Sequence, residues 1–249
     1  MDLLRSAPGR VIQLVVGLWL YGTTMAFMVR AGLGLDPWDV FHQGMAKHWP
    51  LSFGMTVNVV GAIILLAWIP LRQKPGLGTV LNVLLIGTAA DMTLRWLPTA
   101  HGLPVQIGYL AFGIIGNGLA GALYIGAGLG PGPRDGLWTS IVRKRGWSVR
   151  LARTVIEGTV LLTGWLLGGS VGVGTVLYAI AIGPLVQRFL RVVPVTPQSP
   201  LGARRLLVDL HRPAVGVDDL DHRAERRVDP HVAVPGRPER PGECFDVAG

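Results

Sequence analysis

Six long apolar stretches dominate the pattern of hydrophobic and polar positions along the chain. Each is close to the roughly 20 residues that a helix needs to cross a bilayer. Short segments rich in glycine, proline and charged residues separate them. The pattern predicts an all-α membrane fold, a six-helix transmembrane bundle whose spans cover about residues 11–29, 52–70, 77–97, 105–126, 149–168 and 172–193.

The second half of this pattern repeats the first. An ungapped shift of 96 residues, from 31 to 127, places the motif at 31–39 on 127–135 and the motif at 76–81 on 172–177. Each copy carries three spans, and copies with an odd number of spans must face opposite ways across a bilayer. We therefore expect two inverted three-helix repeats, at about 11–98 and 105–194, each with a short interrupted or re-entrant helix.

Lysine and arginine residues are distributed unevenly over the predicted loops, which sets the orientation. With a cytoplasmic N-terminus, the far side of the membrane carries Arg30, Lys47 and Arg95 alone. We expect a multi-pass protein of the cell membrane with both termini cytoplasmic and the first helix retained. The cytoplasmic side then carries Arg5, Arg10, Arg72, Lys74, Arg134, Arg143, Lys144, Arg145, Arg150, Arg188 and Arg191.

Composition agrees with a protein whose main partner is the lipid bilayer. Half of the 249 residues are hydrophobic and 15% are charged, against roughly 25% charged in a soluble domain. The formal net charge of +8 arises on the loops of the membrane part, so it gives no support to nucleic-acid binding. Residues 195–249 are rich in proline, arginine and acidic residues, and we interpret them as a disordered cytoplasmic tail or an out-of-frame read-through.

A proline-linked motif follows the first span of each copy. Asp36 and Pro37 match an N-cap and the first position of a helix, with Asp39 at the third position. The second copy has Pro133 and Asp135 at the corresponding places. About three helical turns follow, too few to cross a bilayer. Each segment is either an interfacial helix that caps its own amides or a re-entrant half-helix near a substrate or ion site.

Glycines and threonines punctuate both copies at the same places. A Gly-x-Gly-Thr sequence opens the last helix of each copy, where we expect a tight turn, a threonine at the helix start and close packing. These residues are interpreted as structural. The set comprises Gly32, Gly34, Pro37, Gly128, Gly130, Pro133, Gly76, Gly78, Thr79, Gly172, Gly174 and Thr175.

Ionisable and amide side chains inside the spans are costly and therefore candidates for function. Glu157 lies four residues after Arg153, and Asp91 four residues before Arg95, so each pair can form on one helix face. Asn117 in the fourth span is interpreted mainly as a contact between helices. The candidates for a substrate or ion pathway are Asp36, Asp39, Asp135, Glu157, Asp91 and Asn117.

Catalysis finds little support in the sequence. No intramembrane Gly-x-Ser-x-Gly or His-Glu-x-x-His motif occurs, and the only cysteine is Cys244 in the tail. We expect no metal, no cofactor and no enzymatic activity. Our leading interpretation is a small transporter or permease for a small molecule or ion, and the alternative is a non-transporting membrane protein that scaffolds or regulates a partner.

The motifs resemble the bacterial YczE-type integral membrane proteins (YczE, YyaS) and, more loosely, the YitT group. The resemblance rests on 31–44, 51–54, 69–72, 75–79 and 84–87 and covers roughly residues 10–194. It implies a cell-membrane protein and supplies no substrate. The second copy departs from the first motif, with Gly132 in place of Asp36 and Arg134 in place of Trp38.

Overall fold

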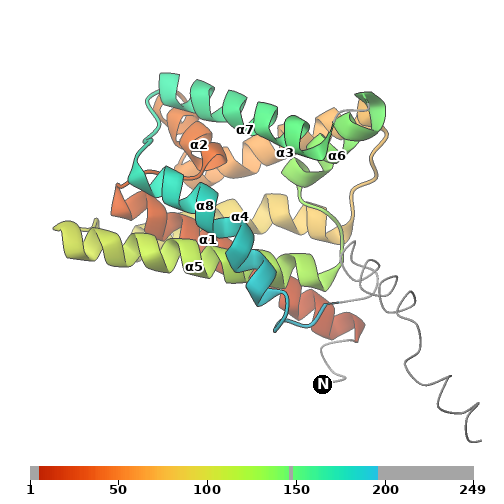
Figure 1. Cartoon of the computed structure of the whole chain (residues 1–249), viewed down its shortest axis with the longest axis horizontal. Coiled ribbons are helices and arrows are strands. Elements are labelled where there is room, and N and C mark those ends of the chain that lie inside the picture. The colour runs from red at the N-terminus through yellow and green to blue at the C-terminus, as the bar shows by residue number, and fades with distance from the viewer. Residues whose placement is uncertain (1–5, 146–147, 196–249) are drawn as a thin grey trace, which may run out of the picture. The chain divides into compact units, whose positions relative to one another are not determined.

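The computed structural model describes residues 6–145 and 148–195, and all of its regular structure is helical (Figure 1). Apart from Val195, the predicted tail lies outside these residues. All six predicted spans are helices, and both segments that follow the proline-linked motifs are short helices. The elements are α1 (Ala7–Ala31), α2 (Pro37–His48), α3 (Phe53–Leu71), α4 (Leu77–Trp96), α5 (Leu103–Ala127), α6 (Pro133–Arg145), α7 (Val149–Leu166) and α8 (Val173–Phe189).

Four of these helices, α1, α3, α4 and α5, are long and apolar enough to cross a membrane. The helix α7 is long enough but carries Arg150, Arg153 and Glu157, and α8 has only 17 residues. The length and composition of the described helices thus give a protein with at least four membrane-capable helices. Six spans remain the sequence-based prediction.

The core of the fold is an antiparallel pair formed by α1 and α5. Near the start of α1, Gln13 donates to the carbonyl oxygen of Leu123 at 3.0 Å, close to the end of α5. Further along α1, Thr24 accepts from Asn117 at 3.2 Å, nearer the start of α5. Gly17 lies against the backbone of Tyr124, where a Cβ atom would come within 2.9 Å. Small residues allow the two backbones to approach this closely.

The helices of the two halves begin at a constant offset. α1 and α5 begin at 7 and 103, α2 and α6 at 37 and 133, α3 and α7 at 53 and 149, and α4 and α8 at 77 and 173. Each difference is 96 residues. The offset found in the sequence motifs therefore extends to all four pairs of helix starts.

Two loops cross between the halves and hold the starts of α4 and α8. Gly78 donates its backbone N–H to the carbonyl of Leu129, and Gly174 donates to the carbonyl of Leu33, both at 2.8 Å. These two hydrogen bonds correspond to each other under the 96-residue offset. Each half therefore supplies the loop that completes a helix start in the other half.

Glycine is required where these loops pass the helix starts. Gly34 has φ of 110° and Gly130 has φ of 128°, a region that residues with a Cβ rarely adopt. A Cβ on Gly34 would come within 2.6 Å of the backbone nitrogen of Gly172, and one on Gly130 within 3.0 Å of Gly76. Backbone conformation and close packing thus both explain the repeated glycines.

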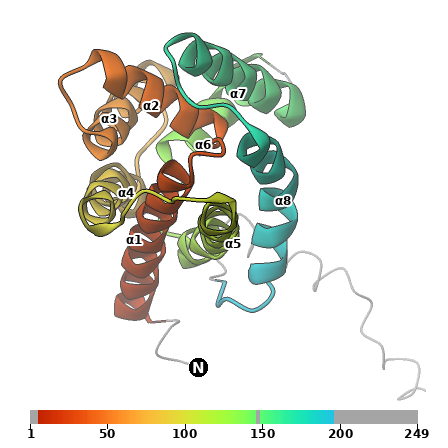
Figure 2. The ribbon, with the colours of Figure 1, turned by 90° about the vertical axis from the view of Figure 1, so that its left-hand side faces the viewer.

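The short helices α2 and α6 pack against long helices of the opposite half. Gly164 of α7 lies against the backbone of Val40 and Phe41 in α2. Trp68 of α3 donates its indole N–H to the carbonyl of Pro133 at the start of α6, at 3.1 Å. In Figure 2, α4 and α8 lie on the two sides of the α1–α5 pair, with the short helices α2 and α6 above it.

The helix pairs α3–α4 and α7–α8 differ, although they correspond by sequence offset. In the first pair, which we call the α3–α4 seam, the backbones of Gly54 and Gly87 are so close that a Cβ on either would overlap the other's carbonyl oxygen. Asn58 adds a hydrogen bond from Gly87 N–H at 3.0 Å. In the second pair, Gly183 of α8 has no atom within 4 Å of the place its Cβ would take. The helices α7 and α8 therefore do not close on each other.

Candidate functional site

The start of α2 places two carboxylates inside the protein. Asp36 is the N-cap and accepts from the backbone N–H groups of Trp38 at 3.0 Å and Asp39 at 3.3 Å. Pro37 occupies the first helical position, where its missing N–H costs nothing. Asp36 is 4% exposed and Asp39 is 0% exposed, so this helix begins in the interior of the described fold.

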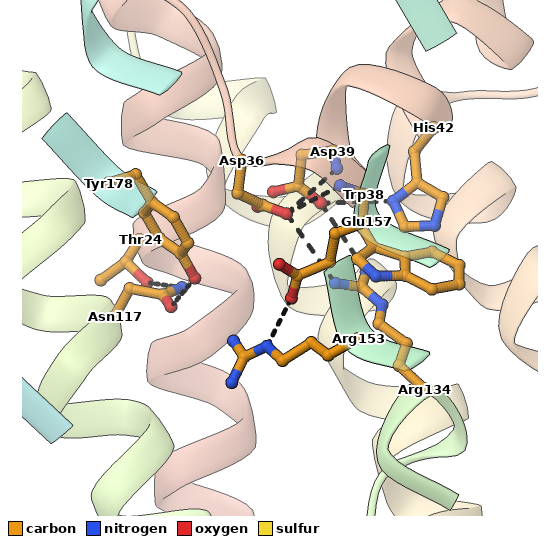
Figure 3. A network of polar contacts seen from close by, with 10 residues as sticks. All are labelled: Thr24, Asp36, Trp38, Asp39, His42, Asn117, Arg134, Arg153, Glu157 and Tyr178. Carbon is orange, nitrogen blue, oxygen red and sulfur yellow. Dashed lines mark hydrogen bonds and ion pairs between the residues drawn. The ribbon is translucent and has the colours of Figure 1, made fainter. Parts of the chain in front are cut away.

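Arg134, near the start of α6, meets both carboxylates (Figure 3). One guanidinium nitrogen lies 4.0 Å from Asp36 Oδ1 and another 3.8 Å from Asp39 Oδ1. The guanidinium also lies over the ring of Trp38, 5.0 Å from its centroid. A largely buried cation, 26% exposed, is thereby paired with two anions and an aromatic face, which offsets the cost of removing it from water.

The residues in this cluster mark where the two copies differ. Trp38 and Arg134 occupy corresponding positions under the 96-residue offset, and they stack on each other. Asp36 corresponds to Gly132, so the second copy provides no carboxylate there. The departures from the repeat noted in the sequence are thus complementary: one copy supplies the acid and the aromatic ring, and the other supplies the base.

His42 extends the cluster along α2. Its Nδ1 lies 3.2 Å from Asp39 Oδ1, and the side chain is 1% exposed. Among the described residues, Asp39 Oδ2 is buried with no hydrogen-bond partner. A buried carboxylate oxygen without a donor is unusual, which marks Asp39 as a candidate functional group.

A cavity of about 460 Å³ adjoins the cluster, and we call it the central cavity. Its size falls within the range of about 300–1,000 Å³ for small-molecule sites. Apolar side chains of α3, α4 and α8 form much of its wall, Val57, Ile86 and Ile182 among them. Its polar lining includes Asp36, Asn82, Asn117, Arg134, Asp135, Arg153, Glu157 and Gln187, together with Tyr21, Tyr124 and Tyr178.

Three polar contacts border the central cavity. Asn117 donates to Thr24 at 3.2 Å and accepts from the Tyr178 hydroxyl at 2.9 Å, which joins α1, α5 and α8. Arg153 and Glu157 pair along α7 at 2.7 Å, as their spacing predicted. Their side chains are 57% and 37% exposed, so this pair lies where the cavity opens to the outside.

Asp91 lies elsewhere, and its predicted pairing with Arg95 is wrong. Its carboxylate accepts from the backbone N–H of Gly54 at 2.8 Å and of Met55 at 3.2 Å, and from the Ser52 hydroxyl. The first turn of α3 has N–H groups without helical partners. Asp91 accepts hydrogen bonds from these groups and does not pair with Arg95. Asp91 is therefore a structural cap and does not line the central cavity.

The structure shows threonine at the start of α4 and α8. Thr79 Oγ1 accepts from Gly76 N–H at 3.1 Å, and Thr175 Oγ1 accepts from Gly172 N–H at 3.2 Å. Thr79 also donates to the carbonyl of Pro131 at 2.7 Å.

In the part of the chain that the structure describes, no group of three His, Cys, Asp or Glu residues could hold a metal ion.

The structure brings together Asp36, Asp135, Glu157 and Asn117 in the wall of one cavity and separates Asp91 from them. Asp39 joins this group through Arg134, which lies beside it. Sequence reasoning missed Arg134, Trp38 and His42 as members of the cluster. One signal was available, because Arg134 and Trp38 are the positions at which the repeated motif diverges. The tyrosines of the cavity carry no such signal in the sequence.

Comparisons with known proteins agree with this membrane fold. The model of a family of unknown function, DUF6198, matches residues 8–191. A Haemophilus influenzae protein described as uncharacterized is 36% identical over 187 residues, which are 75% of this chain and 86% of the relative. The Bacillus subtilis "uncharacterized membrane protein YczE" is 36% identical over 170 residues, 68% of this chain and 78% of the relative. No solved structure matches the chain.

The family model covers the described helices from the second residue of α1 to beyond the end of α8. The matches confirm the resemblance indicated by the motifs at 31–44 and 75–79. The chain therefore belongs to the DUF6198 family, that of the YczE-type membrane proteins.

Proposed function

We propose that the protein is a small permease, in which two inverted repeats enclose a substrate site in the central cavity. The observation that carries the proposal is the cavity itself, which is partly open, charged and placed between the two halves. Ionisable side chains are costly inside a membrane protein and are retained mainly where they serve a pathway or a site. A purely structural bundle has no need of such a cavity.

The antiparallel packing of α1 and α5 supports the inverted arrangement. These helices begin at corresponding positions, 7 and 103, and run in opposite directions. Two halves related in this way face opposite sides of a bilayer. The lysine and arginine distribution then assigns both termini to the cytoplasm, and the cavity, which opens beside Arg153 near the start of α7, faces the cytoplasmic side.

The unequal helix pairs support alternation between two states. The α3–α4 seam is closed, whereas its counterpart α7–α8 leaves the cavity open at Arg153 and Glu157. In inverted-repeat transporters the two halves can exchange conformations, which moves the opening from one side to the other. The α3–α4 seam would then separate when α7 and α8 close.

Access to the cavity from both sides tests the proposal. With Cys244→Ser as background, Val57→Cys places one thiol in the cavity wall, where Val57 is 8% exposed. Charged, membrane-impermeant methanethiosulfonates are applied to sealed vesicles of either orientation. Modification from both sides is expected of a permease. Modification from one side only, or from neither, would overturn the proposal and favour a protein that regulates or scaffolds a partner.

Two controls accompany this experiment. Leu162→Cys lies on α7, is 55% exposed in the described fold and does not line the cavity, so we expect it to remain unmodified in the bilayer. Lys47→Cys and Arg143→Cys report the orientation of the halves, and we expect labelling from opposite sides. Labelling of both from the same side would contradict the inverted repeat.

A further inference from the structure

We propose that the carboxyl groups of Asp36 and Asp39 share one exchangeable proton, and that this proton is the coupling ion of the permease. The inference rests on the proposed function, because coupling requires the cavity to open to the two sides in turn. It depends on the net charge of the buried cluster, on the contact between the two carboxyl groups and on the position of Asp36 in the cavity wall.

The cluster carries one unbalanced negative charge when both carboxyl groups are ionised. Asp36 and Asp39 contribute two negative charges, and Arg134 contributes one positive charge (Figure 3). Both carboxyl groups are almost fully buried. A net charge is costly in such surroundings, and buried groups commonly avoid the cost by taking up or releasing a proton. One proton on the pair makes the cluster neutral.

The two carboxyl groups also interact with each other. The side chains of Asp36 and Asp39 lie within hydrogen-bonding reach. An ionised carboxylate is only an acceptor, so two carboxyl groups form a hydrogen bond only when one of them carries a proton. Close carboxylates repel each other when both are ionised, and such a pair retains one proton for this reason. The shared proton supplies a further donor to Asp39, whose Oδ2 lacks one among the described residues.

Titratable side chains on α1, α2 and α8 leave this balance unchanged. His42 approaches Asp39 through Nδ1, and a neutral imidazole with its proton on Nδ1 donates there without adding charge. The phenols of Tyr21 on α1 and Tyr178 on α8 interact electrostatically with both carboxyl groups. Phenols keep their protons at neutral pH, so neither neutralises the pair.

The two helices that pack against α2 supply no balancing charge either. No titratable side chain occurs on α3. On α7, Arg153 is paired with Glu157, and Arg150 is exposed. Arg134 is therefore the cation that compensates the pair, and a proton is the charge that completes the balance.

Asp36 gives the proton access to the central cavity. Asp36 and His42 line the cavity, whereas Asp39 lies behind them against Arg134. A proton on the pair can therefore exchange with water in the cavity. In a permease whose cavity opens to one side at a time, the pair meets the two sides of the membrane in turn, which is the condition for coupling.

The two halves of the protein contribute opposite charges to this site. The first half carries both carboxyl groups on α2, and the second half carries Arg134 on α6. A movement of α6 away from α2 would take the cation from the pair and strengthen proton binding, because a nearby opposite charge favours the ionised carboxylate. Protonation and conformation are thus linked, and the linkage is reciprocal.

Infrared difference spectroscopy of the full-length protein in lipid nanodiscs tests for the shared proton. A carboxylic acid has a carbonyl stretch that a carboxylate lacks, and the band of an exchangeable acid shifts in heavy water. We expect this band in the wild-type protein at neutral pH. Asp36→Asn and Asp39→Asn should each abolish it, because the remaining carboxylate then balances Arg134. Both changes preserve side-chain size, and asparagine is a good N-cap at position 36.

Asp135→Asn is the matched control. Asp135 corresponds to Asp39 under the 96-residue offset and lines the cavity, and its replacement should leave the band in place. Absence of the band from the wild-type protein, a band that does not shift in heavy water, or a full band in either Asp36→Asn or Asp39→Asn would overturn the shared proton. Loss of the band in Asp135→Asn to the same extent would contradict its assignment.

The Val57→Cys protein tests the coupling. The ratio of modification rates from the two sides is measured over a range of pH, and this ratio cancels the pH dependence of the thiol itself. We expect the ratio to change about fivefold or more, as is typical of coupled sites. With Asp39→Asn added, the ratio should be independent of pH. A pH-independent ratio without Asp39→Asn, or the same pH dependence with it, would overturn the role of the proton as coupling ion.

The two proposals fail separately. An acid band that both Asn variants abolish, together with one-sided modification of Val57→Cys, would retain the proton site and reject transport. Two-sided modification of Val57→Cys without an acid band would retain the permease and reject the shared proton.

Discussion

The α3–α4 seam and its counterpart α7–α8 arise from the same pattern, and yet one is closed and the other open. In the first half, Gly54 and Gly87 bring the backbones together and Asp91 caps the start of α3. Under the 96-residue offset, Gly54 corresponds to Arg150 and Asp91 to Gln187. The second half therefore lacks both the small residue and the acid that close the first.

This comparison separates two kinds of position. Residues that both halves share, such as Gly78 and Gly174, build the helix starts and the loops that cross between the halves. Residues that differ form the charged cluster, as Trp38 and Arg134 do, or accompany the difference between the two helix pairs, as Gly54 and Arg150 do. The repeated sequence thus forms the scaffold, and its divergence forms the candidate site.

The largest effect is expected for Arg134→Gln. Its side chain is 26% exposed and compensates Asp36 and Asp39, and removing one member of a buried ionic cluster typically costs about 3–5 kcal/mol. We expect a corresponding loss in the free energy of unfolding, measured by denaturation in detergent. The double variant with Asp39→Asn should recover part of the loss, and a neutral single variant would contradict this description of the cluster.

The next effect concerns the two corresponding glycines of α4 and α8. A methyl group at Gly87 would overlap the backbone of Gly54, whereas Gly183 has open space. Overpacking typically costs about 1–3 kcal/mol, so Gly87→Ala should lower the unfolding midpoint clearly. Gly183→Ala should be neutral or stabilise by up to about 1 kcal/mol, as alanine does in helices. Equal destabilisation by both would remove the distinction between the seam and its counterpart.

A smaller effect is expected for the cap of α3. Asp91→Ala leaves the N–H groups of Gly54 and Met55 without their acceptor, and losing a helix cap costs about 1 kcal/mol. Gln187→Ala, the corresponding change in α8, should change the free energy of unfolding much less. A larger loss for Gln187→Ala would show that the cavity wall is more tightly packed than the structure describes.

The smallest effect on stability is expected at the mouth of the cavity. Arg153 and Glu157 are exposed by 57% and 37%, and exposed ion pairs contribute about 0–1 kcal/mol. Glu157→Gln should therefore leave thermal unfolding almost unchanged. A marked loss of stability would instead make this pair a structural contact.

Much of the fold could be predicted from the sequence because hydrophobic length and turn chemistry are local properties. The long helices begin within a few residues of the predicted spans, and α2 begins at Pro37 with Asp36 as its cap, as expected. The offset of 96 residues also appears in all four pairs of helix starts.

The candidate site was less predictable because its contacts are distant in sequence. Asp36 and Arg134 are brought together because α2 and α6 both pack against α3 and α7. No local pattern in the sequence shows which helices are neighbours. Asp91 shows a second limit of local spacing, because a contact predicted from it did not form. Its spacing from Arg95 suggested a pair on one helix, but the exposed amides at the start of α3 are the stronger partner. Local spacing predicts contacts along one helix and does not rank them against contacts from another.

The loops that cross between the halves have a consequence for biosynthesis. The start of α4 accepts its loop contact from Leu129 of the second half, whereas the start of α8 uses Leu33, which is made earlier. The first half is therefore not finished when its own four helices have left the ribosome. Assembly of the first half must wait until α5 and its following loop have been inserted. A half-length chain could meet the same requirement only by pairing antiparallel with a second copy. The duplication thus places both halves in one polypeptide, whereas two half-length chains would have to meet by diffusion.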